Sequence, residues 1–175
     1  MTKKIIILAV LLYIAGTVSG QEFTFRGLPW GSTVEDIIAK EGQPDSNTHG
    51  QLIYQNQNVA GYNAMLLFYC SPPHSDIYSE KYELRIAQYT IGASNANSEY
   101  VYNDLLDKLS ALYGTPTPGT RPGYTISDRY NYWIISRTKI TLTLLVDLNT
   151  KYKGYSLIFI SYHSPDSIMN EFGDL

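Results

Sequence analysis

The feature that most constrains the fold of this chain is a pair of helix endings that occurs twice. A segment of helical character stops at Gly42 and Pro44, and a second one stops at Gly114 and Pro116. Glycine followed closely by proline is common where a helix ends. The offset between the two glycines equals the offset between the two prolines. This repetition predicts two halves of similar length that are built on one plan.

A strand pattern closes each half at nearly the same offset. Residues 82–89 and residues 155–162 both begin and end with tyrosine, and both have leucine at the third position. Two further strand candidates precede the closing strand in each half, at residues 52–56, 62–70, 130–136 and 140–147. Runs of apolar and aromatic residues bounded by turn residues are typical of strands.

A helix is predicted at the start of each half. In the first half, Ser32 followed by Glu35 matches a capping box. The second helix starts near Asn97 or Ser98 and carries an apolar stripe at helical spacing. The stripe consists of Val101, Leu105, Leu109 and Leu112. A helix with one apolar face is stable when that face packs against a sheet. Strands that are joined by a hairpin pair antiparallel.

We therefore expect an α+β fold of two tandem helix-strand-strand-strand repeats, in which an antiparallel sheet carries both helices on one face. The repeats would span residues 21–92 and 97–165, followed by a C-terminal tail at residues 166–175. The small and polar residues 92–97 would link them. The pattern leaves open whether the halves form one continuous sheet or two lobes.

The N-terminal 20 residues have the order of a secretory signal peptide. Lys3 and Lys4 precede an apolar run at residues 5–15, and Val18 and Gly20 are small enough for a cleavage site. The run is much shorter than the roughly 20 residues that a membrane-spanning helix needs. We expect export to the periplasm or the exterior, with no stable membrane span after cleavage.

Residues that usually carry catalysis or bind metals are sparse. Cys70 is the single cysteine and ends an apolar run, which is typical of a buried side chain. His49, His74 and His163 are far apart and lack the close grouping of a zinc site. The formal net charge is −3, and no basic cluster indicates nucleic-acid binding. We therefore expect no catalytic residues, no metal and no cofactor.

Tyrosine is the unusual residue, with 16 copies against 5 phenylalanines and 2 tryptophans. If Leu84 and Leu157 face the helices, strand alternation turns Tyr89 and Tyr162 to the other side of the sheet. Tyrosine suits surfaces that meet water and also bind. The candidate binding residues are Tyr89, Tyr162, Tyr69, Trp133 and Arg85. The alternative is that the tyrosines only cover a half-buried sheet, as β-propensity favours.

A sequence motif resembles a known group of proteins. The run Phe-Arg-Gly-Leu-Pro-Trp-Gly-Ser at residues 25–32, followed by Glu-Gly-Gln-Pro-Asp at residues 41–45, resembles small exported bacterial proteins of uncharacterised function. In element order, the halves are similar to modules of β-lactamase inhibitory protein and of the small lipoprotein of the outer-membrane β-barrel assembly machinery. The resemblance implies a binding or scaffolding role and transfers no specific residue. The lipoprotein's anchoring cysteine has no counterpart after the apolar run.

The expected function is that of a non-catalytic exported module, which engages a protein or a cell-envelope component through a tyrosine-bearing sheet face. An alternative is a hydrolase of envelope polymers, with carboxylates brought together by the fold. A third possibility is assembly through exposed sheet edges. The sequence leaves the partner and the oligomeric state open.

Overall fold

The computed structural model describes residues 23–72, 81–119, 129–146 and 154–167. The predicted signal peptide, residues 1–20, lies outside these ranges. Eight of the strands belong to one sheet: β3 (Ser46–Thr48), β4 (Gln51–Val59), β5 (Tyr62–Ser71), β6 (Glu83–Ser94), β7 (Thr117–Pro118), β8 (Arg129–Ile135), β9 (Thr138–Val146) and β10 (Tyr155–His163).

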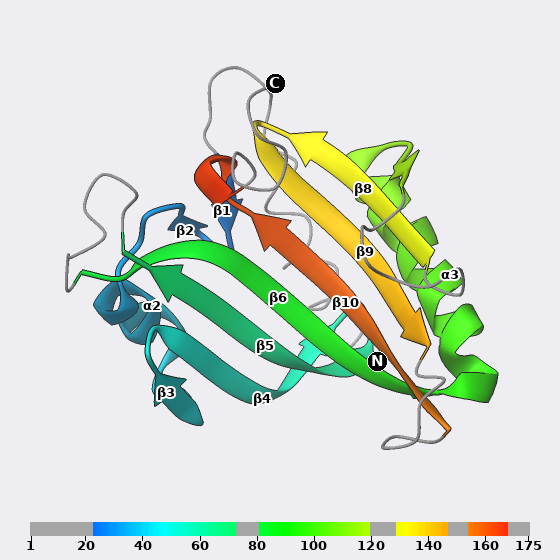
Figure 1. Ribbon diagram of the computed structural model, residues 1–175, viewed down its shortest axis with the longest axis horizontal. Helices are drawn as coiled ribbons and strands as arrows, with labels where there is room; N and C mark the ends of the chain where they lie inside the picture. Colours follow the sequence, from blue (N-terminus) through cyan, green and yellow to red (C-terminus); the bar gives the residue numbers. More distant parts are fainter. Residues whose placement is uncertain (1–22, 73–80, 120–128, 147–153, 168–175) are drawn as a thin grey trace, which may run out of the picture.

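The sheet is continuous and entirely antiparallel, with the strand order β3-β4-β5-β6-β10-β9-β8-β7 (Figure 1). The two predicted closing strands, β6 and β10, are neighbours at its centre. They pair from Tyr155 opposite Ser94 to His163 opposite Ile86. This long central pairing joins the two halves of the chain, so they form one sheet and not two lobes.

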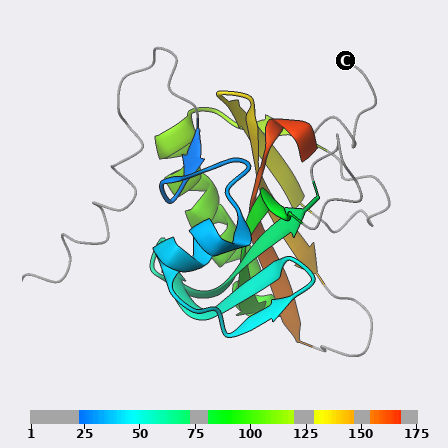
Figure 2. The same ribbon diagram turned by 90° about the vertical axis from the view of Figure 1, so that its left-hand side faces the viewer.

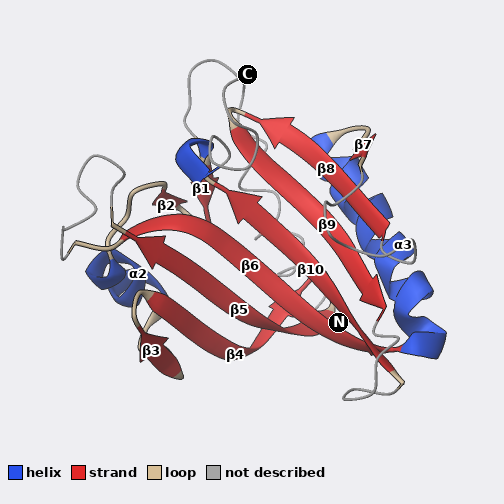
Figure 3. Cartoon of the chain, viewed as in Figure 1, coloured by secondary structure: helices blue, strands red, loops and turns tan. Residues whose placement is uncertain are grey.

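The predicted fold class, α+β with tandem helix-strand-strand-strand repeats, is wrong. The described part of the chain is mostly β, with 55% strand, and Figure 3 shows the strands as the main part of the structure. Two short strands that we did not predict, β3 and β7, extend the sheet at its two edges. At one edge the chain reverses at Gly50 (φ 77°), where an added Cβ would lie 2.5 Å from Tyr82. The predicted linker at residues 92–97 is instead the end of β6 and the first turn of a helix, because the ladder with β10 continues to Ser94.

Two helices, α2 (Val34–Glu41) and α3 (Asn95–Tyr113), lie on the same side of the sheet (Figure 2). The capping box of α2 begins one residue later than predicted. The Thr33 hydroxyl accepts the backbone N–H of Asp36, and the Asp36 carboxylate accepts the backbone N–H of Thr33. Along α3 the predicted stripe is buried as far as Leu109, whereas Leu112 is exposed.

A small N-terminal hairpin, β1 (Thr24–Phe25) and β2 (Leu28–Pro29), packs on the helix side of the sheet. The ring of Phe25 lies 4.9 Å from that of Tyr162 and 5.7 Å from that of Phe68, measured between centroids. The indole N–H of Trp30 donates a hydrogen bond to Thr138 Oγ1 at 2.8 Å. The Phe-Arg-Gly-Leu-Pro-Trp motif therefore helps to close the hydrophobic core.

Candidate functional site

The candidate site is the surface of the sheet that lies opposite α2 and α3 (Figures 1 and 2). Side chains alternate along each strand, so the residues between the core positions point to this surface. Strand pairing aligns them in three rows that cross β5, β6, β10, β9 and β8. We call the three rows together the helix-free face. The first row is Leu67, Gln88, Ser161, Thr141 and Tyr132; the second is Met65, Thr90, Phe159, Thr143 and Tyr130; the third is Tyr69, Ile86, His163, Lys139 and Ile134.

The middle of the helix-free face is polar and internally hydrogen-bonded. The Gln88 amide donates to Thr90 Oγ1 at 3.2 Å, and the Ser161 hydroxyl donates to Gln88 Oε1 at 3.1 Å. Thr141 and Thr143 are buried, with 4% and 2% exposure. A partner would therefore meet the larger neighbouring side chains before it reached these hydroxyls.

Two tyrosines and a lysine form the β8 end of the face. The rings of Tyr130 and Tyr132 lie 6.1 Å apart between centroids. Lys139 Nζ lies 5.9 Å from the first centroid and 5.8 Å from the second, which is within range of cation–π attraction. An added Cβ on Gly119 would lie 2.7 Å from Cδ1 of Tyr130, so a glycine is required there for the chain to pass this close to the ring.

The exposed apolar side chains of the described strands also lie on this side. Ile134, Tyr155 and Leu157 have exposed fractions of 55%, 62% and 42%. Leu157 lies opposite Gly92, and a glycine has no side chain that could cover the leucine. A Cβ added at Gly92 would meet no atom within 4 Å, so the space beside Leu157 is open. Tyr155 and Leu157 therefore form an accessible apolar corner next to the second row.

The predicted site residues Tyr89 and Tyr162 do not lie on this face. Both are 6% exposed and belong to the hydrophobic core. The Tyr89 hydroxyl accepts a hydrogen bond from Arg26 at 3.2 Å, and the Tyr162 hydroxyl lies 3.5 Å from that of Tyr113. Burial raises the pKa of both tyrosines, that of Tyr162 well above its ordinary value.

A β-bulge accounts for the error at Tyr89. Opposite the consecutive residues Tyr69 and Cys70, β6 places Ile86 and Leu84, so Arg85 is an extra residue. An extra residue reverses the facing of every later position in the strand. Leu84 faces the core as predicted, and Tyr89 faces it as well.

The error at Tyr162 has another cause. From Leu157 to Tyr162, all residues except Ser161 are apolar or aromatic, so both faces of this strand could be buried. We predicted that Leu157 and Phe159 face the helices. The structure instead buries Ile158, Ile160 and Tyr162 against them and leaves Leu157 exposed. Two apolar faces on one strand make the alternation pattern ambiguous.

Trp133 is in the hydrophobic core and Arg85 is the extra residue of the bulge, whereas Tyr69 lies on the helix-free face and is half-buried. Trp133 is 3% exposed and donates its indole N–H to the carbonyl of Gly114 at 2.8 Å. Arg85 pairs with Glu83 at 3.0 Å and with Asp166 at 2.6 Å. It therefore ties β6 to the segment that follows β10.

Sequence reasoning missed Tyr130, Tyr132, Lys139 and Phe159 as members of the face. A signal for the two tyrosines was present, because they are two positions apart in a predicted strand and so must share a face. Lys139 lies opposite Ile134 on β9, is 4% exposed, and extends its ammonium group toward the two rings. Lys139 was missed because residues 137–139 were expected to connect the two strands, whereas β9 begins at Thr138.

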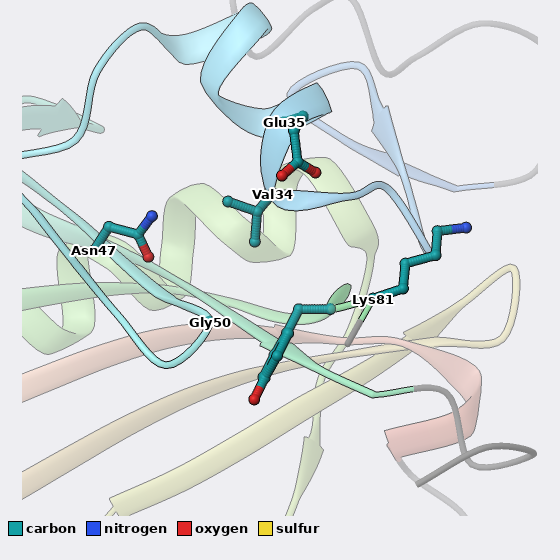
Figure 4. A pocket seen from close by; sticks show the side chains of 6 residues that line it. Val34, Glu35, Asn47, Gly50 and Lys81 are labelled. Carbon is teal, nitrogen blue, oxygen red and sulfur yellow. The ribbon is translucent and has the colours of Figure 1, made fainter. Parts of the chain in front are cut away.

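A polar pocket of about 310 Å³ lies apart from the three rows, between the start of α2, the turn before β4 and the start of β6 (Figure 4). Its lining consists of Val34, Glu35, Asn47, Gly50, Lys81 and Tyr82. Glycoside hydrolysis normally takes two facing carboxylates. Glu35 is the single carboxylate in this lining, so the pocket does not support the hydrolase alternative.

Nucleophilic and metal chemistry find no support within the described ranges. Cys70 is buried, and burial raises the pKa of its thiol to about 12, so the reactive thiolate does not form near neutral pH. No group of three or more His, Cys, Asp or Glu side chains in the described part of the chain is placed to hold a metal ion. Neither of these observations indicates an active site.

Comparison with protein-family models, with curated proteins and with solved structures finds no match to this chain. Among the described residues, no helix has the length and apolar character to cross a bilayer.

Proposed function

We propose that this chain is a non-catalytic, exported binding module that engages a protein or a cell-envelope component through the helix-free face. The observation that carries the proposal is the position of Ile134, Tyr155 and Leu157. These are the described strand residues with large, exposed apolar side chains, and strand alternation places all three on the side of the sheet opposite the core. Tyr155 and Leu157 lie next to each other at the start of β10, and neighbouring exposed apolar groups are typical of interaction sites. Ile134 lies at the opposite end of the face, where it pairs with Lys139, which pairs with His163 at the end of β10.

The charge of the face supports recognition by packing and hydrogen bonding. The three rows contain no aspartate or glutamate, and the one lysine, Lys139, is 4% exposed. Described carboxylates lie outside the three rows, such as Glu35 on α2, Glu99 on α3 and Glu83 at the start of β6. Binding through the face should therefore depend little on salt, because no accessible charge pair is there to be screened.

The edges of the sheet are less suited to the alternative of edge-to-edge assembly. β3 and β7 are three and two residues long. Beyond β3, the Asp45 carboxylate accepts the backbone N–H of Gln55 at 2.7 Å, and a bulge interrupts β4 between Tyr54 and Gln57. Short strands and bulges at an edge hinder the addition of another strand.

A crosslinking experiment tests the proposal. The mature chain, residues 21–175, is mixed with cell-envelope extract, and its captured partners are compared with those of a Tyr155→Ser, Leu157→Ser variant. The matched control is Tyr100→Ser, Leu112→Ser, which removes the same two residue types from α3, where they are 72% and 40% exposed. Both variants must first show the circular dichroism spectrum of the unaltered chain.

We expect a partner that the control variant captures and the face variant does not. Capture should change little between low and moderate salt. A partner captured equally by all three proteins would place binding elsewhere. No specific partner at all would contradict the proposed binding function and direct work to activity screening.

A further inference from the structure

We draw no further inference here: the strongest candidate, the exposed apolar corner of the sheet formed by Tyr155 and Leu157 beside Gly92, belongs to the helix-free face already described, and nothing in the structure shows what covers it.

Discussion

Tyrosines on the two sides of the large sheet are held by different contacts. On the helix side, Tyr89 and Tyr162 are surrounded by aromatic rings and their hydroxyls meet Arg26 and Tyr113. On the helix-free face, Tyr132 stays half-buried beside Lys139. The comparison shows that a high tyrosine content does not by itself locate a binding surface, because the same side chain also serves as a core residue whose polar tip is satisfied.

The largest difference in the free energy of unfolding is expected between tyrosine-to-serine substitutions on the two sides of the sheet. Tyr162→Ser removes a buried ring that stacks on Phe23 and lies tilted against Phe25, and we expect a loss of about 3–5 kcal/mol in the free energy of unfolding. Tyr132→Ser removes a half-buried ring and should cost about 1 kcal/mol. Urea unfolding followed by fluorescence measures both. Equal losses would mean that the two sides are not the different environments described above.

A second test concerns the ion pair that orients Arg26 toward Tyr89. Arg26 binds both carboxylate oxygens of Glu41, at 2.9 and 2.7 Å, and the Glu41 side chain is 8% exposed. We expect Glu41→Gln to cost about 2 kcal/mol, less than a fully buried pair, because the Arg26 side chain is 30% exposed. Thermal or urea unfolding provides the measurement.

The control for this pair is Glu99→Gln. Glu99 pairs with Arg129 at 2.6 Å, but both side chains are about half exposed, at 57% and 45%. Exposed pairs contribute little, and we expect a loss below about 1 kcal/mol. A loss as large as that of Glu41→Gln would show that burial is not what distinguishes the two pairs.

A smaller effect on stability is expected at alkaline pH, where the burial of Tyr162 on the helix side matters. Burial raises the pKa of Tyr162 well above the value of about 10 that it has in an unfolded chain. Its contribution to stability is therefore complete below about pH 10 and is lost as the pH rises toward the folded pKa. We expect Tyr162→Phe to lose less stability than the unaltered chain between about pH 9 and about pH 11. Parallel stability curves for the two proteins would refute this assignment.

The smallest effect is expected at the exposed corner of the helix-free face. Leu157 is 42% exposed and lies opposite Gly92, so Leu157→Ser should change the free energy of unfolding by less than about 0.5 kcal/mol. The neighbouring core residue Ile158 is fully buried, and Ile158→Ser should cost several times more. Similar losses at these adjacent positions would reverse the assigned facing of β10.

Local sequence signals located the secondary structure well. Strands were predicted at residues 62–70 and 155–162, and the structure has β5 at Tyr62–Ser71 and β10 at Tyr155–His163. The second helix ends just before Gly114, as its residues indicated. Such signals act within a few residues of the chain, through turn geometry and side-chain periodicity, and are therefore readable without the fold.

The candidate site was much less predictable. Of the five predicted residues, Tyr69 lies on the helix-free face, while Tyr89, Tyr162 and Trp133 are in the core and Arg85 is in a bulge. The facing of a strand depends on what packs against it, and this is a long-range property. Lys139 was missed for a local reason, because the predicted strand began at residue 140, whereas β9 begins at Thr138 and brings Lys139 beside Tyr132.

By itself, the sequence determined where the longer strands and the two helices lie, because turn residues and local periodicity act over a few positions; the two-residue and three-residue strands were missed. Only the tertiary structure decided which side of each strand is covered. The bulge at Arg85 adds one residue to β6, so the side chains after it face the opposite side of the sheet from the one that simple alternation predicts. Strand β10 carries apolar residues on both sides, so its sequence does not indicate which side is buried. The buried side of both strands is the one that Phe25 of the N-terminal hairpin contacts through Tyr89 and Tyr162, which are far from it in the sequence.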